Sequence, residues 1–385
     1  MAYSLLEAKT IEELCKVVDC EHKTAPYVEH SEYLVVRTSN VRNGQLLMKD
    51  MKYTTIDGFT EWTKRAVPEY GDVLFTREAP AGESCLVPKD RIICMGQRMV
   101  MLRVNKLEVD PLFLSMILNT ERTKADILRL SIGSTVSRIN IADIKRLKVA
   151  SPPLPEQRKI ASILGTWDKA ISTTERLIDN SKQQKKNLMQ QLLTGKKRLF
   201  DESGKPFEGE WERVELGKLL DYKQPTPYLV KSTEYSNEYP IPVLTAGKTF
   251  ILGYSNEDFG IFSEELPAII FDDFTTASKF VDFPFKAKSS AMKILVAKDG
   301  VSIKYIYEAM QVLNYPVGGH QRHWISIFAN LVIGLPSPEE QQKIATVLTN
   351  ADKEVELLKQ KFTDLKQEKK ALMQQLLTGK RRVKV

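Results

Sequence analysis

Apolar residues recur at alternating steps of four and three residues in two long stretches of the chain. Threonine, serine and lysine interrupt the first stretch, and a lysine interrupts the second. A spacing that averages about 3.5 residues predicts a coiled-coil seam, in which each helix turns one stripe toward a partner helix. The predicted seam positions are Ile160, Leu164, Trp167, Ile171, Ile178, Leu188 and Leu192, and then Ile344, Leu348, Val355, Leu358, Phe362, Leu365, Leu372 and Leu376.

The two stretches are copies of one sequence. Residues 156–198 align with residues 340–382 without a gap, at an offset of 184, and 22 of the 43 positions are identical. Prolines precede each copy, and Gly195 and Gly379 follow, which predicts where each helix begins and ends. Each predicted helix has about 39 residues and is roughly 58 Å long.

The simplest partner for one predicted helix is the other. An antiparallel pair would keep the equivalent residues Lys185 and Lys369 apart along the seam. The alternative is two ordinary surface helices on separate domains. However, the run of regularly spaced apolar positions is longer than a helix on the surface of a globular domain requires.

The repeat divides the chain into four segments: globular domains at 1–150 and 200–334, and helices at 151–199 and 335–385. Strands are predicted in the first domain at Glu32–Val41, Asp72–Arg77 and Gln97–Val104, and in the second at Pro240–Ala246, Pro267–Asp273 and Met292–Lys298. Helices are predicted at Pro111–Leu130 and Val301–Leu313. Both domains therefore have an α+β plan, although they share little sequence.

Composition limits the number of domains and the classes of protein to which the chain can belong. A chain of 385 residues with 27% charged residues is large enough for two or three globular domains. The net charge of +7 divides into +2, +6, −5 and +4 over the four segments, so it does not by itself indicate that the domains bind nucleic acid. The chain lacks a long apolar run, has acids near its N-terminus and contains four cysteines, so we expect a cytoplasmic protein without a membrane span or a disulfide framework.

No catalytic or metal site can be named from the motifs. The sequence LTAGKT at 244–249 has Pro242 where a phosphate-binding loop requires its first glycine, so a turn is predicted. The sequences DPLF at 110–113 and DFPF at 282–285 each lack one proline of the Asp-Pro-Pro-Phe motif of amino-methyltransferases. Cys15, Cys20 and His22 do not have zinc-site spacing, and Cys15 is predicted to be a buried helix residue.

These features together resemble a known family. The duplicated helices, with PPLPEQRKIASIL and LMQQLLTGKKR, and the sequence GSTVSRINIADIKRLKVASPPLPEQ at 133–157 are similar to the specificity (S) subunit of type I restriction-modification systems. The counterpart GGHQRHWISIFANLVIGLPSPEEQ at 318–341 departs from the pattern because it lacks the Ser-Thr-Val-Ser stretch. The resemblance covers the whole chain, as two target recognition domains that are each followed by a conserved helix.

The resemblance implies a DNA-recognition subunit without catalysis or cofactors of its own. Each domain would recognise one half of a bipartite double-stranded DNA target, and the antiparallel helix pair would set the spacer. The helices would dock two methyltransferase (M) subunits, which carry S-adenosylmethionine. Restriction (R) subunits would add ATP-driven translocation and cleavage.

The resemblance also suggests where DNA is contacted: on loops at strand ends and on the stretch before each helix. In the first domain these residues are Arg37, Ser39, Asn40, Arg42, Arg77, Ser134, Thr135, Ser137 and Arg138. In the second they are Lys248, Thr275, Lys279, Gln321, Arg322 and His323. For the aligned residues Arg138 and Arg322, a salt bridge to the start of the following helix is an equally good interpretation.

Two other classes of function stay open. The chain could be a coiled-coil scaffold whose domains bind other proteins or RNA, and intact partner binding without a bipartite DNA preference would favour it. It could also be an enzyme with an unrecognised active site, which turnover by the isolated chain would support.

Overall fold

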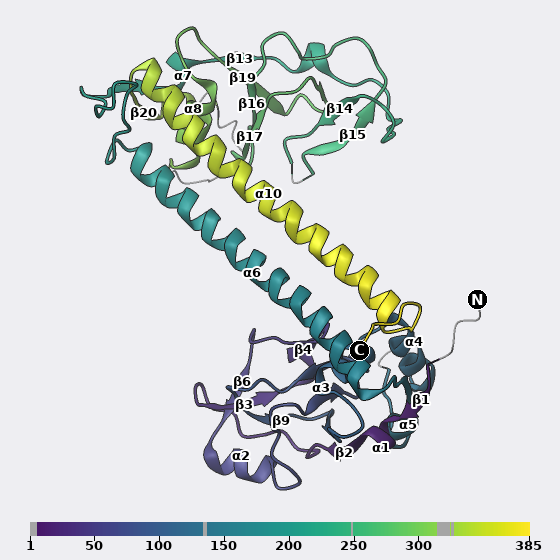
Figure 1. The fold of residues 1–385 in the computed structure, drawn as a ribbon. Helices are drawn as coiled ribbons and strands as arrows, with labels where there is room; N and C mark the ends of the chain where they lie inside the picture. Colours follow the sequence, from purple (N-terminus) through teal and green to yellow (C-terminus); the bar gives the residue numbers. More distant parts are fainter. Residues whose placement is uncertain (1–5, 134–136, 248, 314–323, 325–326) are drawn as a thin grey trace. The chain divides into compact units, whose positions relative to one another are not determined.

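The computed structural model describes residues 6–133, 137–247, 249–313, 324 and 327–385. They form two compact units, Met1–Thr174 with Lys361–Val385, and Glu175–Gln360. Each unit contains one globular domain and part of each of two long helices (Figure 1). The compact units therefore differ from the four consecutive segments, because each long helix contributes to both units.

Domain one, the globular part of unit one, mixes short strands and helices. Its elements are β1 (Ala8–Thr10), α1 (Ile11–Leu14), β2 (Cys15–Asp19), β3 (Tyr33–Val36), η1 (Thr38–Asn40), β4 (Val41–Arg42), β5 (Gln45–Leu46), β6 (Lys52–Thr54), α2 (Ile56–Trp62), β7 (Val73–Thr76), β8 (Ser84–Leu86), β9 (Ile92–Met95), β10 (Met99–Val104), α3 (Pro111–Leu118), α4 (Glu121–Leu130), α5 (Ile141–Arg146) and β11 (Lys148–Ala150).

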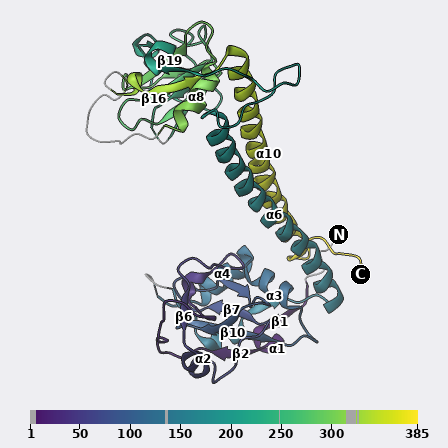
Figure 2. The ribbon, with the colours of Figure 1, turned by 90° about the vertical axis from the view of Figure 1, so that its left-hand side faces the viewer.

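Two sheets form the centre of domain one. The larger has the order β2-β10-β7-β8 and is antiparallel throughout. Figure 2 labels three of its strands, β2, β10 and β7. The smaller has the order β6-β3-β9, with β3 parallel to β9. Strands β7 and β10 are almost entirely buried, and Phe75, Leu102 and Phe113 belong to the core between the larger sheet and α3. The α+β plan predicted from the sequence is confirmed.

Domain two, in unit two, has elements in a closely matching order. They are β12 (Glu212–Glu215), α7 (Leu216–Leu219), β13 (Leu220–Lys223), η2 (Thr226–Tyr228), β14 (Ile241–Leu244), β15 (Ile251–Ser255), β16 (Ala268–Asp272), β17 (Ser278–Val281), β18 (Lys286–Ala287), β19 (Met292–Ala297), α8 (Ile303–Gln311), η3 (Phe328–Asn330) and β20 (Val332–Leu335).

The two domains share one topology despite their different sequences. The sheet β13-β19-β16-β17 corresponds to β2-β10-β7-β8, and β15-β14-β18 corresponds to β6-β3-β9. In each smaller sheet the middle strand has one parallel and one antiparallel neighbour. A two-stranded ribbon, β1 with β11 or β12 with β20, joins each domain's first strand to its last.

Two of the predicted elements are interrupted by local caps. The predicted helix Pro111–Leu130 is two helices, because the side chain of Thr120 accepts a hydrogen bond from the backbone N–H of Thr123 and starts α4. The predicted strand Glu32–Val41 ends at Val36 in β3 and continues as a 3₁₀ turn. Cys15 is buried as predicted, but it begins strand β2 rather than lying in a helix.

The two predicted long helices are present as α6 (Leu154–Leu192) and α10 (Pro338–Leu376). All fifteen predicted seam side chains are buried or half-buried. The interruptions Thr174 and Ser181 are buried too. The hydroxyl of Thr174 donates to the carbonyl of Ala170, so this polar group is satisfied within its own helix.

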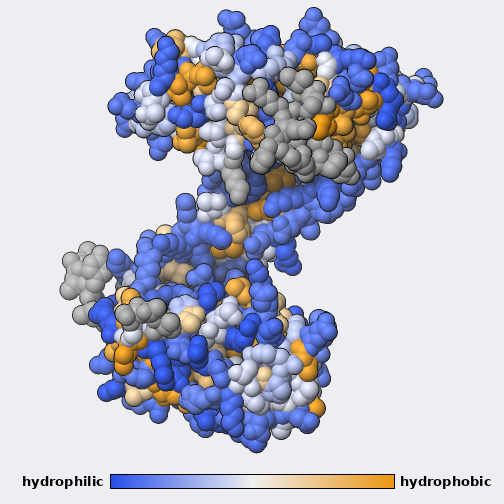
Figure 3. All heavy atoms as spheres, turned by 180° about the vertical axis from the view of Figure 1, so that it is seen from behind, coloured by the Kyte–Doolittle hydropathy of each residue, from blue (hydrophilic) through white to orange (hydrophobic). Residues whose placement is uncertain are grey.

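Most of the visible surface is hydrophilic, with apolar side chains scattered over it (Figure 3). Within the parts of the chain that the structure describes, no helix is both long enough and apolar enough to cross a membrane.

Candidate nucleic-acid interface

Three strands of the larger sheet in domain one bring polar residues to a single edge. Val100 pairs with Asp19 and Met99 pairs with Thr76, so the ends of β2 and β7 lie beside the start of β10. The residues just beyond these strands line a pocket of about 230 Å³. We call this lining the recognition edge; it consists of His22, Arg77, Glu78, Gln97, Arg98 and Arg138.

Arg77 is the buried support of the recognition edge. Its guanidinium donates to Asp19 Oδ1 at 3.1 Å and to the carbonyl of Ile139 at 3.5 Å. The backbone N–H of Ile139 in turn donates to the carbonyl of Arg77 at 2.9 Å. Only 6% of Arg77 is exposed, so its charge is used to hold the stretch that carries Arg138.

The exposed groups at the recognition edge are suited to base or phosphate contacts. Arg98 and Arg138 are exposed, and Arg98 forms an ion pair with Glu78. The half-buried Gln97 lies beside them, and its side-chain amide donates to the carbonyl of His22 at 3.2 Å. Arginine pairs with the O6 and N7 atoms of guanine, and glutamine with the N6 and N7 atoms of adenine.

The stretch from Arg37 to Arg42 adjoins the same edge. Because β3 and β9 are parallel, the backbone N–H of Gly96 donates to the carbonyl of Val36, and Arg37 lies beside the turn before β10. A Cβ on Gly96 would lie 3.2 Å from Arg37 Cγ, so the glycine permits this close approach.

Three of the predicted contact residues in this stretch bond to the backbone of their own loop. Asn40 is fully buried, and its amide donates to the carbonyls of Leu47 and Lys49. Arg37 donates to the carbonyl of Asp50, and Arg42 donates to the carbonyls of Thr38 and Val41. Ser39 is exposed. The buried side chain of Asn40 therefore stabilises the conformation of its own loop.

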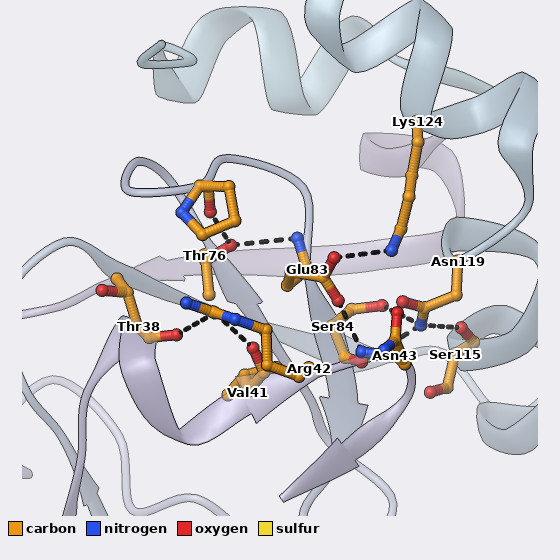
Figure 4. Close-up of polar contacts among 11 residues, drawn as sticks. Thr38, Val41, Arg42, Asn43, Thr76, Glu83, Ser84, Ser115, Asn119 and Lys124 are labelled. Carbon is orange, nitrogen blue, oxygen red and sulfur yellow. Dashed lines mark hydrogen bonds and ion pairs between the residues drawn. The ribbon is translucent and has the colours of Figure 1, made fainter. Parts of the chain in front are cut away.

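Glu83 ties the β4–β5 hairpin to α4 (Figure 4). Its carboxylate accepts from the backbone N–H of Asn43 and from Lys124, both at 2.6 Å. Its own backbone N–H donates to the hydroxyl of Thr76 at the end of β7. The hairpin is thus fixed to the same end of the sheet as the recognition edge.

Domain two carries a different set of groups at the matching edge. Asp272 pairs with Met292, so Asp273 lies where Arg77 lies in domain one. Asp273 is buried, and its carboxylate lies 3.6 Å from the ammonium of Lys293 and accepts from the backbone N–H of Trp324 at 2.9 Å. Thr275, in the β16–β17 turn, and Lys279, in strand β17, are exposed.

The predicted contact residues thus divide into three groups. Arg77 and Asn40 are buried supports, whereas Ser39, Arg138, Thr275 and Lys279 are exposed and Arg37, Arg42 and Ser137 are half-buried. The predictions that lie outside the described residues are Ser134, Thr135, Lys248, Gln321, Arg322 and His323. Among the described residues, the carboxylate at the start of α6, Glu156, forms its ion pair with Arg382.

Sequence reasoning missed His22, Gln97 and Arg98. The signal for the last two was the sequence MGQRM between two buried strands, which indicates a tight turn that exposes its polar residues. Arg98 lies in this turn with a φ of 67°.

In each unit, the start of one long helix lies beside the end of the other; we call these two places the helix joints. Both helix joints contain the same ion pair. Glu156 at the start of α6 binds Arg382 beyond the end of α10, and Glu340 at the start of α10 binds Arg198 beyond the end of α6. These residues are related by the offset of 184, and each pair lies within one unit. The pairs show that the helices are antiparallel in each unit, with the start of one beside the end of the other.

A second ion pair is also repeated at each joint. Lys369 binds Asp168 at 2.5 Å in unit one, and Lys185 binds Asp352 at 2.6 Å in unit two. The two predicted lysine interruptions of the seam are therefore matched by carboxylates. The hydrogen bonds from Arg382 lower the pKa of Glu156 below its ordinary value.

The cysteines of the chain are free and buried. Burial raises the pKa of Cys15, Cys85 and Cys94 to about 12, so these thiols are protonated and unreactive at neutral pH. Within the residues placed by the structure, no group of three histidine, cysteine or carboxylate side chains could hold a metal ion.

Comparison with known proteins identifies the family. Residues 4–182 and 208–367 each match the model of the type I restriction modification DNA specificity domain. The chain belongs to this family. Its two matches fall on the two domains with the adjoining parts of α6 and α10, so the internal repeat is a tandem of family domains.

Individual relatives agree with this assignment. The chain is 47% identical over 163 residues to the EcoR124I/EcoR124II specificity subunit of Escherichia coli, a match that covers 41% of this chain and 39% of that protein. It is 29% identical over 354 residues to a Methanocaldococcus jannaschii protein named as the MjaX specificity subunit, covering 82% and 79%. A crystal structure of an S subunit from M. genitalium has the same fold, with a TM-score of 0.67 at 16% identity, covering 98% and 97%.

Proposed function

We propose that the chain is the DNA-recognition subunit of a type I restriction-modification complex. Each domain recognises one half of a bipartite double-stranded DNA target. The observation that carries the proposal is the pair of domains with one topology and different edge chemistry, each attached to a copy of the same helix. Two recognition domains on a repeated support suit a target with two half-sites at a fixed separation.

The helix pair sets the spacer and docks the methyltransferase subunits. Leu177 and Leu357, which lie beside the seam in unit two, are 46% and 71% exposed, so apolar surface is available to a protein partner. Two M subunits bind in this way, and R subunits join them in the full complex. Catalysis resides on those partners, which carry S-adenosylmethionine and ATP, and the chain itself is non-catalytic and cytoplasmic.

The direct test is to map N6-methyladenine across the host genome, with the gene intact and deleted. The expected result is a split motif with a fixed spacer that disappears on deletion. An unchanged methylation map, together with failure of the chain to co-purify with a methyltransferase, would overturn the proposal and favour a scaffold outside restriction-modification.

A further inference from the structure

A second basic site lies in unit one, and its lining shares no residue with the recognition edge. It is a cleft of about 610 Å³ between domain one and the last turns of α10. We call it the basic cleft; it is lined by Asn43, Asn119, Thr120, Glu121, Arg122, Lys124, Lys366, Lys369, Lys370, Met373, Gln374, Thr378 and Lys380. Six of these residues carry a positive charge and one a negative charge.

Carboxylates neutralise only part of this charge. Lys124 binds Glu83, Lys369 binds Asp168 and Lys370 binds Glu121. For the other three cations, Arg122, Lys366 and Lys380, no carboxylate among the described residues is within ion-pair distance, and all three are exposed. The cleft therefore has three positive groups that are available to an anion.

The positions of these cations suit an extended anion. Lys366, Lys369 and Lys370 are three and four residues apart on α10, so they lie on one face of that helix. Arg122 lies in the first turn of α4, across the cleft. Positive groups on both walls suit a chain of phosphates better than one small ion.

The basic cleft reaches the end of the larger sheet that carries the recognition edge. Asn43 lines the cleft, and Glu83 holds both Asn43 and Lys124 (Figure 4). Phe75 pairs with Ser84, so Glu83 lies at the end of the sheet where Thr76 leads into Arg77. A duplex bound at the recognition edge would reach the cleft with its adjoining backbone.

We propose that the basic cleft binds backbone phosphates of the DNA next to the half-site that domain one recognises. The inference rests on the proposed function and adds to it a contact that does not depend on base sequence. Phosphate contacts fix the register of a protein on DNA and release counterions, so they strengthen binding to any duplex and make binding sensitive to salt.

The test is the triple variant R122Q/K366Q/K380Q of the full chain. Affinity for a fluorescent duplex of random sequence is measured over a range of salt concentrations. We expect affinity to fall by about tenfold or more at low salt, and the salt slope to fall by roughly one for each lost phosphate contact. The preference for target over random duplex should stay the same.

A matched control removes the same charge from the other end of the sheet. K16Q/K145Q/K148Q replaces three exposed lysines near the start of β2 and the ribbon β1–β11, and should bind as the unaltered chain does. Equal affinity and salt slope for both triple variants would overturn the proposal. So would loss of methyltransferase binding by R122Q/K366Q/K380Q with DNA binding intact, which would assign the cleft to an acidic protein surface. If the unaltered chain binds no duplex, the proposed function fails instead.

Discussion

Arg77 and Asp273 occupy the same place in the two domains and carry opposite charges. Each follows the central strand of its sheet, is almost fully buried and bonds to the stretch that leads back to the long helix. In domain one the partner charge is Asp19 on β2, and in domain two it is Lys293 on β19. The position is kept as a support, but the charges around it have been replaced.

The helix joints behave differently. Glu156 with Arg382 and Glu340 with Arg198 preserve both the residue types and the geometry. The glutamines that follow these acids are also equivalent: Gln157 accepts from the backbone N–H of Asp110, and Gln341 accepts from that of Ser302, at the caps of α3 and α8.

The contrast separates two tasks within one chain. Residues that hold the helices together have kept their chemistry after the duplication. Residues at the edges of the sheets have changed theirs, while the backbone topology remained. Such a pattern is expected if the helices perform one mechanical task twice and the domains recognise different ligands.

The largest effect is expected when a helix joint is broken. Arg198→Ala leaves the carboxylate of Glu340, which is buried, without its ionic partner. We expect the free energy of unfolding of unit two to fall by about 3 kcal/mol, as measured by denaturant titration. Lys197→Ala, at an exposed neighbour, should change it by less than about 0.5 kcal/mol. Equal effects of the two variants would show that the ion pair does not hold the joint.

The recognition edge should affect specificity rather than stability. Arg98→Ala removes an exposed guanidinium whose ion-pair partner among the described residues is Glu78. We expect a loss of about 1–3 kcal/mol of discrimination at one base pair, confined to one half of the methylated motif. Methylation mapping checks this, with Arg91→Ala, at an exposed arginine in the same domain, as the control. An unchanged methylated DNA motif in this variant would show that Arg98 does not contribute to base recognition.

A smaller effect on stability is expected from the buried charged residues that distinguish the helix joint of unit two from that of unit one. The caps of α3 and α8 place Lys304 and Glu308 where unit one has Leu112 and Met116. Glu308 is fully buried between Lys185 and Lys304, which also contact Asp352. We expect K304L/E308M to keep the stability of unit two or raise it by about 1 kcal/mol, because apolar residues often replace buried ions without loss. A clear fall in the denaturation midpoint would instead give the ionic network a stabilising role.

The smallest effect concerns pH. Because Arg382 lowers the pKa of Glu156, the stabilisation is complete above the unfolded value near 4.5 and is lost as the pH falls through the folded value. We expect Glu156→Gln to flatten the dependence of unit-one stability on pH in this acidic range. An identical pH dependence in the variant and the unaltered chain would contradict the assignment.

The long helices were predictable because their signals are local. Prolines, the 3.5-residue spacing and the repeated glycines gave their ends to within a few residues of α6 and α10. The break between α3 and α4 also had a local signal, since Thr120 followed by Glu121 is a typical helix start. The shared topology of the two domains had no local sequence signal, because different sequences pack into the same strand order.

The exposure of the predicted contact residues was only partly predictable, because burial of a polar side chain depends on distant segments. Arg77 follows a strand and has the chemistry of a DNA contact, but Asp19 and Ile139, far away in sequence, enclose it. Asn40 is similarly enclosed by the backbone at Leu47 and Lys49. Arg98 was missed for the opposite reason, since a turn inside a run of buried strands exposes it.

The most direct test of the central claim is a domain exchange. Residues 1–150 would be replaced by the first domain of another specificity subunit, with α6, domain two and α10 retained, and N6-methyladenine would be mapped. The account predicts that one half of the split motif changes, while the other half and the spacer stay the same. A change in both halves, or in neither, would contradict the claim that two independent recognition domains share a duplicated helical support.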